Sequence, residues 1–252
     1  MDLEWEDSAR GQEYITWQEL PYLKVEVKQV SAIGTSIWAI GGDRQIYLFV
    51  HSIDLPIRIK EEAFENQRWI PFEGFSSKLL PTDRPQFSSE DGLVKRIPEE
   101  IHLPSSAWAW EESSWKIEAS LNGQPLDVKG WTYAVDFPAN YHPQKLWSSC
   151  VRRRKWVRHR IYAAVDEWNA VEPINPNNPA EEPFVDVCVG GQDIVGAPNG
   201  HLSVWAVTAK GRVLYRQGVT AMCPEGVCWE EIAVSHEESH EVKQVGVGSM
   251  VP

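Results

Sequence analysis

Short apolar runs and stretches that alternate apolar with polar residues fill most of this chain, and turn residues separate them. Examples are the segments SIWAI at 36–40, QIYLFV at 45–50 and SVWAV at 203–207. Alternation with a period of two is typical of strands that bury one face. Long helices need a 3.6-residue period, and this sequence shows little of it. We therefore expect a mainly β protein with many short strands joined by turns.

The longest strict alternation lies in residues 150–162, CVRRRKWVRHRIY. In a strand, one face then carries four arginines and a tryptophan: Arg152, Arg154, Trp156, Arg158 and Arg160. Guanidinium groups stack on aromatic rings, so this face needs aromatic partners from elsewhere. Candidates for the stacked set lie upstream: Arg68, Trp69, Trp108, Trp110, Trp115 and Trp131. We predict such stacking inside the fold, and binding of phosphate or nucleic acid is the open alternative.

One pattern recurs at both ends of the chain. It runs from a Trp-x-x-Leu/Val segment through a Val-rich strand ending in Gly to a strand with Trp-Ala, followed by a Gly turn. The copies start at Trp17, Trp168 and Trp229. Each copy is too small to bury its faces alone, so we interpret the copies as units of one repeat architecture.

This order resembles the tectonin repeat, which forms one blade of a β-propeller. The Cys223–Trp229 connection, CPEGVCW, resembles the Pro-x-Gly-x-x-Trp link of that family. A propeller needs about four to eight blades. We therefore expect incomplete tectonin units at residues 1–55 and 164–252, with the last one truncated.

The block between these units lacks the repeat and carries other motifs: ENQRW at 65–69, LLPTDRP at 79–85, GWTYAVDF at 130–137 and VRRRKWVR at 151–158. In this order they resemble the two halves of the dysferlin (DysF) domain, which also occurs in peroxisomal peroxins. We expect a DysF domain at residues 56–163 that folds alone, because its two ends must lie close together to rejoin the flanking strands.

A DysF domain set between tectonin repeats resembles the tectonin repeat proteins of the autophagy and lysosome system. The resemblance implies a non-enzymatic, cytosolic adaptor that contacts lysosome or autophagosome membranes peripherally. Sphingomyelin, or another phospholipid, is the implied ligand of the DysF domain, and autophagy proteins would bind through regions absent here. The rival function is a protein-interaction module at peroxisomal or other organelle membranes.

Charge divides the chain in the same way as the motifs do. Residues 56–162 carry 16 basic against 14 acidic residues, whereas the remainder carries 8 against 22, within a total formal charge of −12. This acidic total disfavours general nucleic-acid binding. No apolar stretch reaches 18 residues and no CxxC pair occurs, so we expect a reduced chain whose membrane contact is peripheral.

A polar, proline-punctuated loop before the arginine-rich strand holds the pair Leu146 and Trp147. A Leu-Trp pair at a loop tip beside a lysine suits insertion at a lipid interface, which makes Tyr141, Lys145, Leu146 and Trp147 candidate lipid contacts. Alternatively, Trp147 folds back as a stacking partner for the arginines.

Signs of catalysis are weak. Residues 236–240, HEESH, match the zinc-protease pattern H-E-x-x-H, but they lie in a connection between repeat segments rather than in a helical pattern. The Gly-Gly pairs at 41–42 and 190–191 lack the Gly-Lys-Ser/Thr continuation of a phosphate loop. We expect no enzymatic activity, metal or cofactor.

Overall fold

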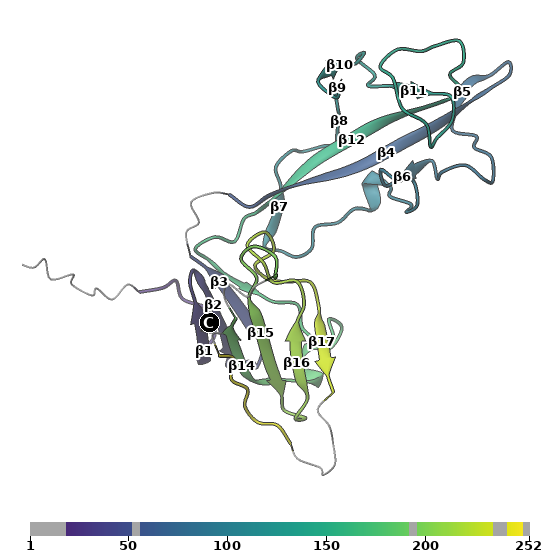
Figure 1. Ribbon diagram of the computed structural model, residues 1–252. Helices are drawn as coiled ribbons and strands as arrows, with labels where there is room; N and C mark the ends of the chain where they lie inside the picture. Colours follow the sequence, from purple (N-terminus) through teal and green to yellow (C-terminus); the bar gives the residue numbers. More distant parts are fainter. Residues whose placement is uncertain (1–18, 52–55, 192–195, 234–240, 249–252) are drawn as a thin grey trace, which may run out of the picture.

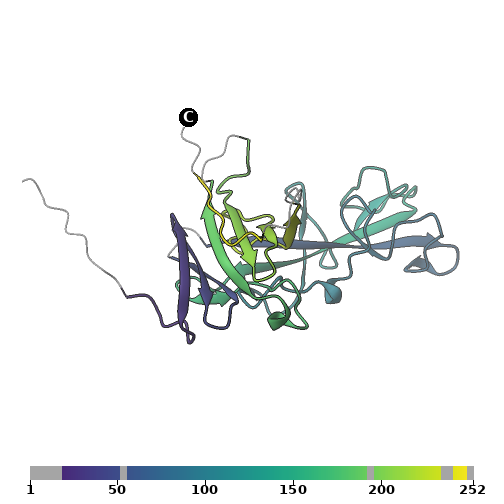
Figure 2. The same cartoon turned by 90° about the horizontal axis from the view of Figure 1, so that it is seen from below.

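The computed structural model describes residues 19–51, 56–191, 196–233 and 241–248. Two four-stranded antiparallel sheets lie side by side, and a long arm extends away from them (Figure 1, Figure 2). The regular structure of the described residues is β apart from two short 3-10 helices, η1 Pro98–Glu100 and η2 Pro179–Glu181. The expected mainly β class is confirmed.

The first sheet is built from two parts of the chain that the whole arm separates. Its strands follow the order β1 Val27–Ile33, β2 Ser36–Gly41, β3 Ile46–Val50 and β13 Trp168–Ala170. Trp168 pairs with Phe49, and their rings lie 5.3 Å apart. The expectation that Trp168 opens the second unit is therefore wrong, because its strand covers the free edge of β3 and closes the first sheet. Trp17 lies outside the described residues.

The second sheet is continuous in sequence. Its strands follow the order β14 Phe184–Gly190, β15 Ser203–Thr208, β16 Val213–Arg216 and β17 Trp229–Ile232. Trp229 occupies the position that Trp168 has in the first sheet, and it pairs with Arg216, whose guanidinium carbon lies 5.3 Å from the indole. A Trp-initiated segment thus ends a sheet in both places.

The first strand of each sheet, β1 or β14, is its inner strand, and these two inner strands lie next to one another. Ser31 Oγ of β1 accepts the Val189 N–H of β14 at 3.0 Å, and Cys188 Sγ of β14 accepts the Val247 N–H at 3.3 Å. Residues 242–245 repeat the letters VKQV of residues 27–30. The segment 241–248 therefore takes the place of a further inner strand beside β14.

Residues 56–163, which we call the arm, are organised by two long strands. β4 Arg58–Ile70 and β12 Val151–Tyr162 pair from Arg58 opposite Ile161 to Arg68 opposite Val151. Short strands flank them: β5 Gly74–Ser76, β6 Phe87–Ser88, β7 Trp108–Trp110, β8 Lys116–Ile117 and β11 Thr132–Ala134, while β9 Ser120–Leu121 and β10 Gln124–Pro125 form a separate hairpin. We call the end at Arg58 the root and the end at Ile70 the tip; the tip points away from both sheets (Figure 1).

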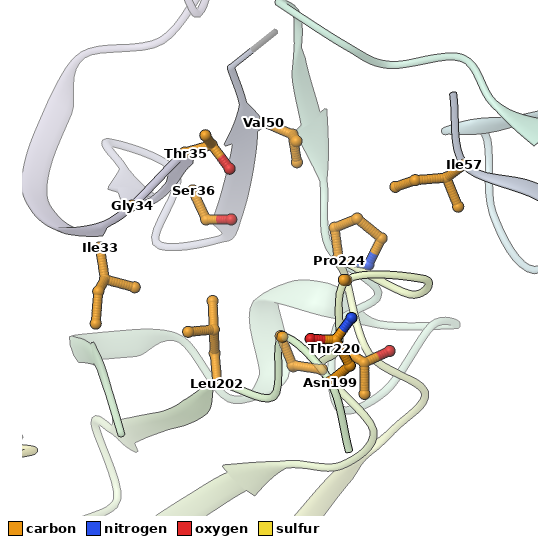
Figure 3. A pocket seen from close by; sticks show the side chains of 13 residues that line it. Ile33, Gly34, Thr35, Ser36, Val50, Ile57, Asn199, Leu202, Thr220 and Pro224 are labelled. Atoms are coloured by element: carbon orange, nitrogen blue, oxygen red, sulfur yellow. The ribbon is translucent and has the colours of Figure 1, made fainter. Parts of the chain in front are cut away.

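The root is packed into the core of the two sheets. Ile57, Trp108 and Tyr162 are buried in the same apolar cluster as Trp38 and Leu214 of the sheets. A cavity of about 320 Å³ lies at this junction, with Ile57 on the arm side, and none of the described residues that line it is charged (Figure 3). The arm is therefore joined to the sheets by shared core and not by a linker alone.

Candidate functional site

The tip half of the arginine face forms an alternating stack of cations and rings. The Arg152 guanidinium carbon lies 4.0 Å from the Trp131 ring and 4.7 Å from the Phe75 ring. The Arg154 guanidinium carbon lies 4.6 Å from Trp131 and 4.9 Å from Trp156. Each guanidinium is thus placed against two rings, within the range where cation–π attraction operates.

The root half of the same face continues the stack with rings from another segment. Arg158 lies 4.2 Å from the Trp110 ring, and Arg160 lies 4.9 Å from the Trp108 ring. Trp115 supports Trp110, with ring centroids 5.9 Å apart and planes tilted by 55°. The period of two in β12 therefore places all of its alternate arginines against tryptophans.

The edges of these guanidinium groups are also occupied. Arg154 Nε and Trp156 Nε1 both donate to one oxygen of Glu65, at 2.7 and 2.9 Å. Arg152 donates twice to the side-chain oxygen of Gln67, at 2.9 and 2.6 Å. Faces and edges of Arg152 and Arg154 are thus both engaged inside the arm, which favours the stacking interpretation over phosphate binding. Glu65, Gln67 and Phe75 were not predicted, although the ENQRW motif contains two of them.

Arg68 belongs to a different cluster. Its guanidinium forms a bidentate ion pair with Asp83, at 2.6 and 2.5 Å, and contacts Asp136 at 3.1 Å. Burial of Asp83 opposes ionisation, but the ion pair with Arg68 holds the pKa of that carboxyl below its ordinary value. The guanidinium also lies 5.5 Å from the Phe137 ring. This cluster fastens the LLPTDR segment to β4.

Trp69 does not join the stack. Its side chain is 43% exposed, and within the described part of the chain it contacts no cation or other ring at stacking distance. It pairs across the sheet with Phe75, whose ring contacts Arg152 instead. The prediction that Trp69 belongs to the stacked set is therefore wrong, because its ring lies at the edge of the tip.

Two of the four candidate lipid contacts are engaged within the arm. Tyr141 lies beneath Arg153, with the guanidinium carbon 4.1 Å from the ring, and burial raises the pKa of its phenol. Lys145 Nζ lies 5.4 Å from the Phe75 ring. Both side chains brace the loop against the strands.

The other two candidates point outward. Trp147 is 99% exposed and Leu146 is 48% exposed. The Leu146 N–H donates to Ser149 Oγ at 3.0 Å and the Ser149 N–H donates to the Leu146 carbonyl at 3.1 Å, so a hydrogen-bonded turn presents the pair. Trp147 does not stack on any arginine among the described residues. The geometry therefore agrees with an exposed Trp147 ring and disagrees with a ring that folds back onto the arginines.

A second exposed ring, which was not predicted, lies in a turn at the tip end of the arm. Phe72 occupies the turn between β4 and β5 and is fully exposed. The sequence signal that identifies this turn is Pro71-Phe-Glu-Gly74, a run rich in turn residues directly after a strand.

One group of side chains has the composition of a metal site. Glu111, Glu112 and His159 bring one ligand atom each within 4.8 Å of one another. However, Glu111 is paired with Arg58 at 2.7 Å, and Glu112 is paired with His159 at 2.9 Å. Both carboxylates thus already have hydrogen-bonding partners within the arm. The HEESH segment at 236–240 lies outside the described residues.

Comparison with known proteins matches both parts of this fold. The profile of the Pex24p family, described as integral peroxisomal membrane peroxin, matches residues 22–158. A propeller profile, Hyd_WA, matches residues 203–232, which include β15 to β17. No helix among the described residues has both the length and the apolar character needed to cross a membrane.

The curated relatives share one name. A tectonin beta-propeller repeat-containing protein of Drosophila melanogaster is 52% identical over 92% of this chain and 17% of its own length. Tectonin beta-propeller repeat-containing protein 1 is 44% identical in Xenopus tropicalis, over 96% of this chain and 20% of the relative. The human protein is 43% identical, over 92% of this chain and 20% of the relative.

This chain thus spans about a fifth of the length of the curated relatives that it matches. The peroxin profile covers more than half of the chain, and the propeller profile lies in the second sheet. The chain belongs to the family of tectonin β-propeller repeat-containing proteins and contains a peroxin-type, DysF-like domain.

Proposed function

We propose that this chain is a non-enzymatic membrane adaptor whose arm contacts lipid through its tip, while the blade sheets serve as a scaffold. The observation that carries the proposal is the exposure of Trp147, 99%, beside the half-exposed Leu146 on one hydrogen-bonded turn. A fully exposed indole contributes little to folding, but it binds well at the boundary between lipid head groups and acyl chains.

The charges near the tip favour a neutral head group. Lys78 is paired with Glu73 at 2.9 Å, Arg68 with Asp83 at 2.5 Å, and Lys145 lies against the Phe75 ring. Lys78 and Arg68 are thus compensated by carboxylates, and compensated cations attract anionic lipid weakly. We therefore propose a zwitterionic lipid, with sphingomyelin as the leading candidate, and we expect binding to persist at high ionic strength.

The cellular setting is proposed from the family. The tectonin repeat proteins that this chain resembles belong to the autophagy and lysosome system, so we propose a cytosolic protein that binds damaged or maturing lysosomes and autophagosomes peripherally. The relatives are named as repeat proteins and not as enzymes, which supports an adaptor role. Partners from the autophagy machinery would bind through parts of the longer relatives that this chain does not span.

Liposome co-sedimentation tests the lipid assignment directly. Wild-type chain is mixed with phosphatidylcholine vesicles that contain sphingomyelin, phosphatidylserine or neither, each at low and high salt, with a polynucleotide pull-down as control. We expect Trp147→Ala to lose most of its vesicle binding with a nearly unchanged melting temperature, because an exposed ring adds little to stability. If the variant unfolds, or binds as well as wild type does, Trp147 is not the anchor.

A second candidate function follows from the description of the matched family as a peroxisomal membrane peroxin. A protein-interaction module at peroxisomal or other organelle membranes would use the same exposed tip against a protein surface. Failure of wild-type chain to bind any of these vesicles, together with retention on organelle membranes that is lost after protease treatment, would favour this function.

A further inference from the structure

Phe72 lies in a backbone conformation that does not suit a bulky side chain. Its φ is 69°, in the left-handed region that glycine and asparagine adopt readily. Gly74, two residues later, also has a positive φ of 82°. The turn between β4 and β5 therefore places a phenylalanine where folding alone favours a smaller residue.

Nothing within the described part of the chain compensates for this strain. The Phe72 side chain is fully exposed, with a relative accessibility of 107%, and it forms no ring or cation contact there. A strained residue that makes no stabilising contact suggests a role outside the folded chain. Its apolar ring indicates a contact with an apolar environment.

The topology brings Phe72 to the same end of the arm as Trp147. β4 runs toward the tip and ends at Ile70, whereas β12 starts at the tip, and the Trp69 N–H donates to the Cys150 carbonyl at 2.8 Å. The turn after β4 and the loop before β12 therefore both lie beyond the last paired residues. Lys145 links them, because its loop carries Trp147 and its amine contacts the Phe75 ring of β5.

We propose that Phe72 is a second membrane anchor, and that Phe72 and Trp147 insert together so that the arm meets the bilayer with its tip. This inference rests on the proposed lipid-binding function. Two anchors on separate loops resist tilting better than one, and each adds apolar area removed from water. The arm then holds the blade sheets away from the bilayer, since its root is packed into their shared core.

The charged side chains of this turn are consistent with a position in which the Phe72 ring inserts and the charged groups stay among the head groups. Glu73 follows Phe72 directly, and both of its carboxylate oxygens accept from Lys78 Nζ at 2.9 Å. The carboxylate next to the ring is thus paired with a cation at the height of the head groups. This pair adds no net charge to the tip.

The test uses the whole chain and vesicles of phosphatidylcholine with sphingomyelin. We expect Phe72→Asn to bind about tenfold more weakly than wild type, while its melting temperature stays unchanged or rises, because asparagine tolerates a positive φ. Phe72→Trp should restore binding. Leu93→Ala is the matched control: Leu93 is 83% exposed, but its loop follows β6, which runs from the Phe64–Glu65 pairing toward the root.

The outcomes separate the inference from the proposed function. Loss of binding in Phe72→Asn, recovery in Phe72→Trp and normal binding in Leu93→Ala support two anchors. If Trp147→Ala loses binding while Phe72→Asn binds as wild type does, the second anchor is refuted and the lipid-binding function stands. If Leu93→Ala weakens binding equally, the effect is general surface hydrophobicity and the inference is overturned. If wild type binds no vesicle, the proposed function and the second anchor both fail.

Discussion

Four of the five arginines of β12 contact a ring with the guanidinium face and also donate a hydrogen bond from its edge: Arg152, Arg153, Arg154 and Arg158. Arg154 shows this most clearly, because its face contacts Trp131 and Trp156 while its Nε donates to Glu65. A planar guanidinium can do both at once, whereas an ammonium group cannot. The Trp156 indole joins the same carboxylate at 2.9 Å, so Glu65 fixes a cation and a ring in one geometry.

Replacement of Trp156 measures what this arrangement contributes at the residue scale. We expect Trp156→Ala to lower the free energy of unfolding by about 3 kcal/mol, at the low end for a buried aromatic, because part of the ring is exposed. Trp156→Phe keeps a ring under Arg154 and loses the hydrogen bond to Glu65, so it should cost only about 1 kcal/mol. Urea unfolding curves of the two variants give both values. Equal, small losses would mean that the ring is not part of the stack.

At the scale of elements, the two long strands carry the arm, and irregular segments are fastened onto them. The segment after β7 is attached to the root half of β12 through Glu112, whose carboxylate accepts from the His159 backbone N–H at 2.7 Å and contacts His159 Nδ1 at 2.9 Å. The Arg158 side chain adds a bond to the Glu112 carbonyl at 2.9 Å. These contacts position the segment that supplies Trp110 and Trp115 to the stack.

This attachment predicts a pH dependence. The hydrogen bonds from His159, backbone first and side chain second, lower the pKa of Glu112 from 4.5 to about 2. A carboxyl with a depressed folded pKa stabilises the fold above its unfolded pKa, and that stability is lost as the pH falls from about 4.5 toward 2. Glu112→Gln should therefore flatten the acid side of a melting-temperature profile over this range. An unchanged slope would show that Glu112 is not coupled to folding.

At the scale of the whole molecule, the arm and the sheets share one junction. Glu225, in the connection between β16 and β17, is 3% exposed and accepts from Trp108 Nε1 at 2.8 Å and from Ser105 Oγ at 2.9 Å. The arm returns close to where it began, since the Tyr162 N–H donates to the Ile57 carbonyl at 3.0 Å. The position of the tip relative to the sheets is therefore set by packing at the root.

We expect excised residues 56–163 to fold, because the stack and the long strand pair lie within them. Their root should be less protected than in the whole chain, since Trp108 loses Glu225 and Ile57 loses the core of the sheets. Hydrogen exchange followed by mass spectrometry compares the two forms. Protection at 151–156 with faster exchange at 107–108 and 162–163 is the expected pattern, and a disordered amide spectrum would contradict independent folding.

Local patterns in the sequence determined the β class, the strand with arginines on one face and the loop that carries Trp147. The period of two in residues 151–162 predicted a strand with arginines on one face, and the short alternating runs predicted the β class, because side-chain direction along a strand depends only on neighbouring residues. The loop that carries Trp147 was identified by its prolines and polar residues in the same way. None of these features requires knowledge of a distant part of the chain.

Tertiary structure alone decided which segments meet. Trp168 pairs with β3 although the whole arm separates them in sequence. Trp131 stacks on Arg152, while Trp69 stays half exposed. The sequence signals the turn that holds Phe72, but the exposure of its ring depends on what the rest of the chain places beside that turn. Strand pairing and burial depend on long-range contacts whose free energy is shared among many residues, so no local pattern specifies which edge, ring or carboxylate a side chain will reach.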